Sequence, residues 1–453
     1  MAPLAHGIGG IKDLPVPLWL FYYGAALVLI LSFVALWVLW KRPVLEARSR
    51  GRPVSSRLQR LVESPALHAV LGALSFGLLV VVTAAAVVGD TSPNDNPAPT
   101  FVFVVFWLGL VPLQVLLGNV WSALNPWRAA ADAVAWLSAR VAEPWVPPFA
   151  YPPGLGRWPG AVLLFAFAAL ELAYSRPDDP RAIAVAIVVY STITWLGMLA
   201  FGRETWTANG EAFSVYFGFL ARIAPFGWRD GRLVVRWPFT GLTRLDVRPG
   251  TLAFVAVMLG SVAFDGLSRT EQWVDFRANL MRPVIERSPQ LADVLGTLLA
   301  VAGLVLVVLL VAAAYLLAVR AAAVVTDYPG SLRDAFLASL VPIALAYVVA
   351  HYFSLVVLQT QYMAPIASDP FGRGWDLFGT ADVRPDLGIL TPNIVWYVQV
   401  AALVIGHVAG LALAHDKAVE LFESPRKAAL SQYAMLALMV VYTVAGLWLL
   451  SSG

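Results

Sequence analysis

Long apolar stretches recur along the chain and are separated by shorter polar segments. The hydrocarbon core of a bilayer is about 30 Å thick, and a helix crosses it with about 20 apolar residues. The pattern therefore predicts an all-α fold, a polytopic transmembrane helix bundle in which residues 1–453 form one integral-membrane domain. About ten spans are expected, over 17–40, 67–89, 100–118, 160–174, 182–200, 250–265, 295–319, 335–357, 394–414 and 430–450.

Composition supports a membrane protein over a soluble one. Hydrophobic residues make up 59% of the chain and charged residues only 13%, which is too little charge to cover the surface of a soluble protein of this length. The chain has no cysteine, which excludes disulfides, Cys-ligated zinc and iron–sulfur clusters. The first stretch is too long for a cleavable signal and has no basic segment before it, so we expect it to be retained.

The distribution of basic residues predicts an orientation. Alternate loops hold 22 of the 31 Lys and Arg residues, and such loops face the cytoplasm. Both termini are then expected outside a bacterial plasma membrane, with a net charge of +9 on the inner loops and −5 on the outer ones. Topology and contact with anionic lipid explain the basic pI of about 9.1, so no nucleic-acid partner is expected.

Two inner loops, 119–159 and 201–249, are too apolar to be ordinary connections. We interpret them as cytoplasmic amphipathic segments that lie in the membrane interface, with their indoles at headgroup level. A similar order of features in both suggests an internal duplication, although chance resemblance between apolar segments is an equal alternative. Many transporters bind solute where two repeats meet. The tryptophans of the first segment are Trp121, Trp127, Trp136 and Trp145.

On the outer side, the loop 358–393 is long and rich in Gly, Pro, Asp and aromatic residues. A connection of this length is either functional or disordered, and its apolar residues argue against disorder. We expect a structured external lid; the alternative is a cap that only shields helix ends. The acidic outer face could also dock a protein partner.

Few ionisable residues fall within the spans, and such residues are costly in a bilayer and functional by default. They are Glu171, Asp265, His351 and His407. Each has a structural alternative. Glu171 and Asp265 lie near the outer ends of their spans and could reach water, and Asp265 could cap the next helix.

His407 and His351 differ in expected depth by about 10 Å at 1.5 Å per residue, which excludes a haem held between these two histidines. His407 is flanked by Gly406, Gly410 and Ala414 at four-residue spacing, typical of a face where helices pack closely. The structural alternative for His407 is a hydrogen bond between helices.

A metal site near the outer face is a further hypothesis. His351 and Gln359 lie two turns apart on one helical face, Asp369 follows in the lid loop, and His6 is expected on the same side. Imidazole and oxygen donors can hold Zn, Mn or Fe. No spacing here is diagnostic, because HExxH, HxH and DxD motifs are all missing from the sequence.

Several runs together resemble a family of bacterial, often actinobacterial, polytopic membrane proteins labelled fenitrothion hydrolase. The resemblance extends from the N-terminus to about Ala418. It implies a membrane-embedded protein that hydrolyses phosphotriesters, but it assigns no catalytic residue. The runs are AHGIGGIKDLP, GNVWSALNPWR, FGRETWTANGEAFSVYFGFLARIAPFG, ASDPFGRGWDLFGTAD and QVAALVIGHVAGLALAHDKA.

Three classes of function stay open from the sequence. In a metal-assisted phosphotriester hydrolase, an apolar substrate would reach the site from the lipid bilayer, His351 and Gln359 would hold the metal, and Asp265 and Asp369 would be the catalytic acids. The alternatives are a small-solute transporter or channel, and a membrane scaffold or assembly subunit that docks a partner.

Overall fold

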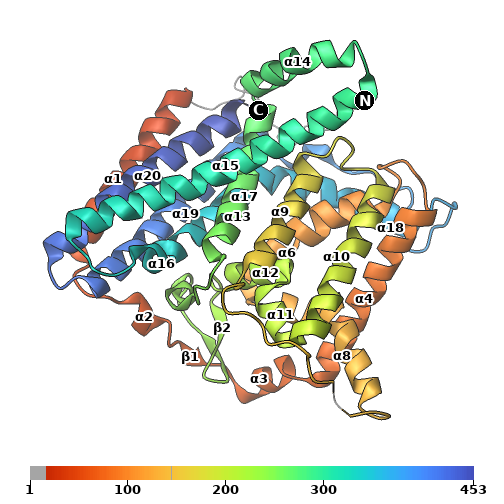
Figure 1. Ribbon diagram of the computed structural model, residues 1–453, viewed down its shortest axis with the longest axis horizontal. Helices are drawn as coiled ribbons and strands as arrows, with labels where there is room; N and C mark the ends of the chain where they lie inside the picture. The colour runs from red at the N-terminus through yellow and green to blue at the C-terminus, as the bar shows by residue number, and fades with distance from the viewer. Residues whose placement is uncertain (1–16, 144, 453) are drawn as a thin grey trace.

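A computed structural model describes residues 17–143 and 145–452, which fold into a helix bundle (Figure 1). Nine helices in this part of the chain are long and apolar enough to cross a membrane. They are α1 (Leu18–Leu39), α4 (Pro65–Val88), the mixed α- and π-helix Pro97–Leu117, α10 (Pro180–Phe201), α13 (Thr251–Arg269), α15 (Pro289–Thr326), α17 (Leu340–Gln359), α19 (Pro392–Leu421) and α20 (Pro425–Ser452).

The remaining expected span, 160–174, corresponds to the shorter helix α9 (Trp158–Leu172). Its 15 residues reach about 22 Å at 1.5 Å per residue, less than the hydrocarbon core of a typical bilayer. The apolar helical architecture is therefore confirmed, and the count of ten crossings stays a prediction.

Most long helices begin in the same way. A Ser, Thr, Asp or Asn side chain accepts a hydrogen bond from the first turn, and proline follows directly. This arrangement satisfies an otherwise unpaired N–H and places proline where its missing N–H costs nothing. The pairs are Ser64–Pro65, Asn96–Pro97, Asn125–Pro126, Asp179–Pro180, Ser288–Pro289 and Thr391–Pro392.

The third span is irregular along its length. The short helix α5 (Pro97–Pro99) leads into a π-helical segment, η2 (Thr100–Leu108), and then into α6 (Leu110–Leu117). At the junction the Gly109 N–H bonds to the carbonyl oxygen of Val104, five residues back. A β-carbon on Gly109 would lie 2.4 Å from a backbone oxygen, so this turn requires glycine. Such π-helical turns are rare and occur frequently at functional sites.

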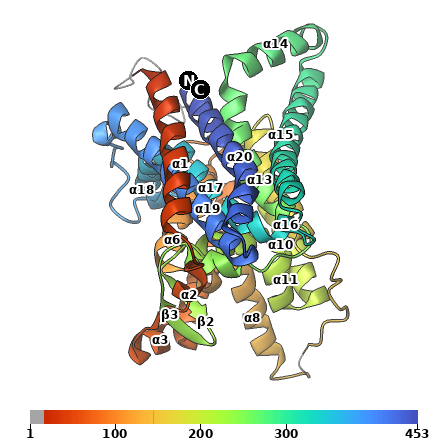
Figure 2. The same ribbon diagram turned by 90° about the vertical axis from the view of Figure 1, so that its left-hand side faces the viewer.

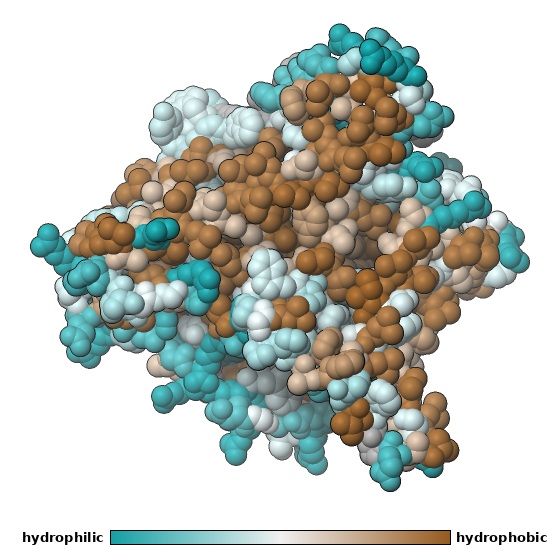
Figure 3. Space-filling model, in the orientation of Figure 1, coloured by the Kyte–Doolittle hydropathy of each residue, from teal (hydrophilic) through white to brown (hydrophobic). Residues whose placement is uncertain are grey.

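The bundle has two distinct ends. Helix α14 (Glu271–Ile285) lies at one end and a small sheet at the other (Figure 2). We call these the α14 end and the sheet end; the charge count predicts that the α14 end faces outside. Hydrophobic residues cover the middle of the face in Figure 3, and hydrophilic residues gather over α14 and near the sheet.

The two ends of the described chain lie on the same side of the bundle. Tyr22 in α1 and Ser451 in α20 face each other at 3.3 Å between their hydroxyl oxygens. This agrees with termini on one side of the membrane, although which side stays a prediction.

The suspected duplication corresponds to a repeated order of elements. Gly118 (φ +94°) ends α6, and α7 (Trp121–Leu124) and α8 (Pro126–Ser138) follow. Gly202 (φ +90°) likewise ends α10, and it is followed by two further helices. These are α11 (Arg203–Asn209) and α12 (Ala212–Ala221). A long helix, a glycine in a conformation that L side chains rarely adopt, a short helix and a capped helix thus occur twice.

The residues of the two inner segments differ in burial, and the interfacial position of these segments stays a prediction. Trp121 and Trp127 are buried, whereas Trp136 and Trp145 are exposed. Helix α12 is buried on almost every side, as expected for a helix that is apolar all round. Trp121 and Trp127 pack in the core, where their indole N–H groups donate to Glu211 and Ser191.

A three-stranded sheet at the sheet end adds to the expected all-α fold. Strands β1 (Arg52–Pro53) and β2 (Phe226–Arg229) both pair antiparallel with the central strand β3 (Arg232–Val235). Asp230 and Gly231, at φ +49° and +72°, form the hairpin turn. Smaller helices complete the fold: α2 (Leu45–Arg48), α3 (Ser56–Val62), η3 (Thr240–Arg244), α16 (Leu332–Phe336) and η4 (Leu337–Ser339).

The loop 358–393 is structured by short helices and turns. It contains η5 (Thr360–Tyr362), α18 (Met363–Ser368) and η6 (Leu387–Ile389). The Ser368 hydroxyl donates to Asp376 at 2.9 Å and accepts the backbone N–H of Phe378 at 3.0 Å. Order in this loop supports both a lid and a cap, and the choice stays open.

Candidate functional site

Asp265 lies at the centre of a buried set of polar side chains between α13 and α17. Its carboxylate is 3% exposed. Oδ1 accepts hydrogen bonds from Nε and Nη2 of Arg269, at 3.1 and 3.0 Å. Oδ2 accepts bonds from the hydroxyl of Tyr352 and from Nε2 of His351, both at 2.9 Å. Because an ionised carboxylate only accepts, this contact places the His351 proton on Nε2.

Helical spacing brings these four side chains together. Asp265 and Arg269 are four residues apart on α13, so they share one face. His351 and Tyr352 are neighbours on α17, which packs against α13. The structural alternative in which Asp265 caps the next helix was wrong: Thr270 is the N-cap of α14 and accepts from the N–H of Trp273.

Glu171, near the end of α9, completes the arrangement. It lies within electrostatic range of Asp265 and Arg269. Its Oε2 atom is buried and has no hydrogen-bond partner among the described residues. Two buried carboxyl groups therefore lie in the field of one guanidinium, that of Arg269, which is itself 33% exposed. We call Glu171, Asp265, Arg269, His351 and Tyr352 the polar cluster.

The space beside His351 is small. A cavity of about 10 Å³ touches His351, Tyr347, Leu403 and Gly446. This volume suits about one water molecule. A phosphotriester does not fit there without movement of the surrounding helices.

The other predicted ligands of a metal lie apart from the polar cluster. Gln359 is the last residue of α17. In the lid loop, the Asp369 carboxylate accepts the backbone N–H groups of Arg373 and Gly374, at 2.8 and 2.6 Å. These bonds hold the pKa of Asp369 below its ordinary value. His6 lies outside the described residues, and within residues 17–143 and 145–452 no three His, Asp or Glu side chains gather to hold a metal.

His407 is fully buried on α19. Its Nδ1 atom bonds to the Leu403 carbonyl oxygen at 2.7 Å, within its own helix. The expected close-packing face is confirmed. A β-carbon on Gly406 would lie 2.3 Å from the side chain of Ala346, and one on Gly410 would lie 2.6 Å from the backbone oxygen of Ser339, just before α17. His407 therefore belongs to a tight helix contact and not to the polar cluster.

A larger cavity lies between α4, η2, α9 and α10. Its volume is about 510 Å³ and its walls are almost entirely apolar. Leu78, Val189 and Ile193 line it and are also exposed on the outer surface of the bundle. The cavity thus opens sideways, toward the lipid that would surround these helices. We call it the lateral cavity; aromatic residues in its wall are Phe101, Phe106, Trp121, Trp127, Phe167, Tyr190 and Phe213.

Glu211, which the sequence reasoning missed, anchors the sheet end of the lateral cavity. This fully buried residue is the N-cap of α12 and accepts the N–H groups of Phe213 and Ser214, at 2.9 and 2.8 Å. Asn125 donates to it at 3.0 Å, and the Tyr190 hydroxyl also donates to it. An acid directly before the apolar run AFSVYFGFLA was the available signal, because that pattern predicts a helix cap.

Replacing Glu211 with glutamine is expected to lower the free energy of unfolding by about 2 kcal/mol, because one acceptor oxygen becomes an NH₂ group that faces other donors. Denaturation followed by tryptophan fluorescence in detergent measures this change. Glu204→Gln is the control: it alters an exposed pair with Arg128, worth about 0.5 kcal/mol. Equal changes in the two variants would contradict a structural role for Glu211.

A single layer of aromatic rings separates the lateral cavity from the polar cluster. Phe167 lines the cavity and packs on Trp107, with ring centroids 5.2 Å apart. Trp107 in turn packs on Tyr352 at 5.5 Å, and Tyr352 donates to Asp265. Trp107 belongs to the π-helical segment η2, so the irregular part of the third span forms this layer.

Comparisons with known proteins do not identify a family for this chain. No protein-family model, curated protein or solved structure matches the chain. The resemblance to the fenitrothion hydrolase group therefore stays an expectation from the sequence, and the contacts of the polar cluster and the lateral cavity are the basis for a function.

Proposed function

We propose that the protein is a proton-linked transporter of an apolar or amphipathic small solute. The polar cluster would bind the proton, and the lateral cavity would bind the solute. The observation that carries the proposal is the π-helical segment η2, which lies between the two sites and contacts both. π-helical turns within a longer helix occur frequently at functional sites.

The charges of the polar cluster support proton binding. Arg269 forms an ion pair with Asp265, which leaves Glu171 as a second carboxyl group beside a cation that is already paired. Two carboxylates this close to each other disfavour their joint ionisation. When Glu171 carries a proton, the polar cluster is neutral. Loss of this proton adds a buried negative charge, which a conformational change can expose to water.

The lateral cavity supports the choice of solute. Its volume of about 510 Å³ falls within the usual range for small-molecule sites. The apolar walls exclude a charged or sugar-like solute, because such groups would lose water without gaining hydrogen bonds. Trp121, Trp127 and Tyr190 line the wall, but their polar atoms already donate to Glu211 and Ser191, which suits a molecule with a largely apolar body.

Hydrolysis is the second candidate, and one contact favours it. The hydrogen bond from His351 to Asp265 orients the imidazole as in enzymes that use histidine as a general base toward water. A divalent Zn, Mn or Fe ion would add the electrophile. The cavity of about 10 Å³ at His351 has room for a water molecule but not for a phosphotriester, so we place transport before hydrolysis.

One probe distinguishes the classes. We expect an uncharged nitroaryl phosphotriester, added to proteoliposomes, to quench the fluorescence of Trp121 and Trp127 in the cavity wall. It should also change the pH reported by an entrapped dye, without release of nitrophenol. Release of nitrophenol would favour a hydrolase. Quenching with no proton movement, for this probe and for a lipophilic aromatic amine, would contradict proton-linked transport.

Matched acid variants test the proton site. Glu171→Gln should retain quenching by the probe but lose proton movement by about tenfold or more, because glutamine cannot exchange a proton. Glu143→Gln removes an exposed acid at the sheet end and should behave as the native protein does. Equal proton movement in native protein and Glu171→Gln would remove Glu171 from the proposed site.

A further inference from the structure

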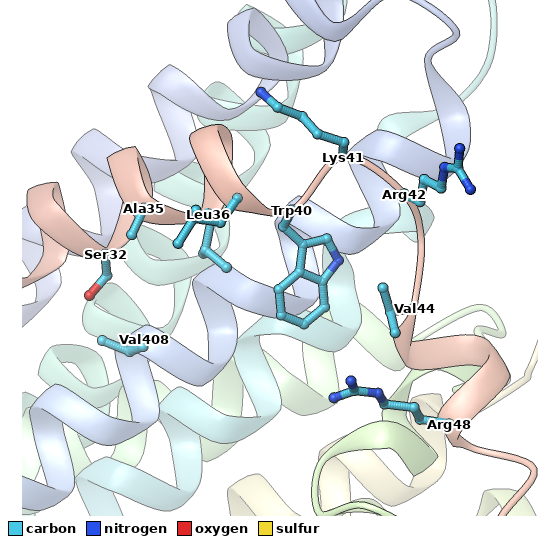
Figure 4. Close-up of a pocket in the computed structure, with 10 residues that line it drawn as sticks. Ser32, Ala35, Leu36, Trp40, Lys41, Arg42, Val44, Arg48 and Val408 are labelled. Carbon is cyan, nitrogen blue, oxygen red and sulfur yellow. The ribbon is translucent and has the colours of Figure 1, made fainter.

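A groove at the sheet end of α1 is separate from both sites described above. Its volume is about 610 Å³, and it lies between α1 and α19 (Figure 4). Ser32, Ala35, Leu36 and Leu39 of α1 and Val408 of α19 form its apolar part. Small side chains at Ser32 and Ala35, three residues apart on one helical face, leave room in the wall of the bundle.

The groove is fixed by hydrogen bonds at its polar end. The Trp40 indole donates to Asp416 Oδ1 at 2.9 Å, and His415 Nε2 donates to the Trp40 carbonyl oxygen at 2.9 Å. Asp416 also accepts the backbone N–H of Val44 at 2.7 Å. These contacts join the end of α1 to α19, so the groove does not depend on a frayed helix end.

The groove runs along the helices into the apolar part of the bundle. Ser32 lies eight residues before Trp40, and Val408 lies eight residues before Asp416. Eight residues of α-helix correspond to about 12 Å. The groove therefore extends about 12 Å from the polar end of α1 into the region that lipid tails would occupy.

Three cations surround the polar end. Lys41 and Arg42 lie on one side of the Trp40 ring, and Arg48 lies on the other (Figure 4). Within the described part of the chain, no carboxylate forms an ion pair with any of the three. Lys41 and Arg48 instead lie over the rings of Trp37 and Trp237, at 5.5 and 4.0 Å.

We propose that this groove binds an anionic glycerophospholipid of the inner leaflet. Lys41, Arg42 and Arg48 would hold the phosphate, and an acyl chain would lie along Ser32, Ala35 and Val408. Charge complementarity favours an anionic headgroup over a zwitterionic one. The apolar floor favours a lipid over free phosphate, because only a lipid fills both parts of the groove.

Native mass spectrometry of the full chain released from nanodiscs tests the site. With equal phosphatidylglycerol and phosphatidylcholine, we expect the protein to retain the anionic lipid in preference. The double variant Arg42→Gln, Arg48→Gln should lose this preference by about tenfold. Arg57→Gln, Arg60→Gln removes the same charge on the same side, outside the groove, and should retain it. Equal loss in both double variants would overturn the site.

Two further measurements separate lipid from phosphate and from misfolding. Ala35→Trp fills the groove without changing charge and should also weaken retention; unchanged retention would overturn the acyl-chain part of the proposal. Glycerol phosphate at millimolar concentration should not displace the lipid, and full displacement would assign the cations to a soluble anion. Each variant is compared at matched unfolding temperature in lipid-free detergent, so that lost retention reports binding.

Discussion

Replacing Asp265 with asparagine is expected to abolish proton movement in proteoliposomes and to lower the free energy of unfolding by about 3 kcal/mol. Breaking a buried ion pair by removing one partner commonly costs about 3–5 kcal/mol. The lower figure applies because the Arg269 side chain is 33% exposed and regains some water. The amide also places an NH₂ group against donors from His351, Tyr352 or Arg269.

The measurement pairs unfolding in sodium dodecyl sulfate, followed by tryptophan fluorescence, with the entrapped-dye assay of proton movement. Asp275→Asn is the matched control, because it removes an exposed acid from the adjacent helix α14. We expect this control to change neither quantity. Proton movement that persists in folded Asp265→Asn would show that Asp265 has only a structural role.

Gly406→Ala is expected to lower the free energy of unfolding by about 3 kcal/mol, although alanine favours helix more than glycine does. The added carbon would lie 2.3 Å from the Ala346 β-carbon and 2.7 Å from the Pro342 carbonyl oxygen. Helices α17 and α19 must then move apart, which costs about 1–3 kcal/mol or more in a packed core. Close approach through small residues such as glycine also favours helix association in a membrane.

Gly77→Ala is the control for this effect. Nothing lies within 4 Å of a β-carbon at Gly77 in α4, so alanine should stabilise its helix by up to about 1 kcal/mol. Unfolding temperatures of the two variants in one detergent are then expected to shift in opposite directions. Equal shifts would show that α17 and α19 accommodate the extra carbon.

Hydropathy predicted the bundle well because apolar length decides where a helix can cross a bilayer. The positions of Gly406 and Gly410 were also predicted from their spacing, since four residues return to one face. By contrast, the hairpin at Asp230–Gly231 was missed, although Asp-Gly between two short runs is a strong local signal. The hairpin was not predicted because the high content of apolar residues indicated an all-α fold for the whole chain.

The polar cluster was predicted in part. Asp265, His351 and Glu171 were selected because charge is costly in a bilayer, and the structure brings them together. Arg269 could have been predicted from its four-residue spacing to Asp265, but this pair was not considered. Glu211, Trp107 and Tyr352 depend on contacts between distant segments, which a single sequence does not specify.

The π-helical segment η2 gives the third span a property that a regular helix would lack. Shifting one residue in register turns a helix face by about 100°. If η2 tightened to α-helical bonds, Phe106 would rotate relative to the lateral cavity and Trp107 would lose its contact with Tyr352. Rotation of one helix segment by one residue would thereby interrupt the aromatic layer between the lateral cavity and the polar cluster.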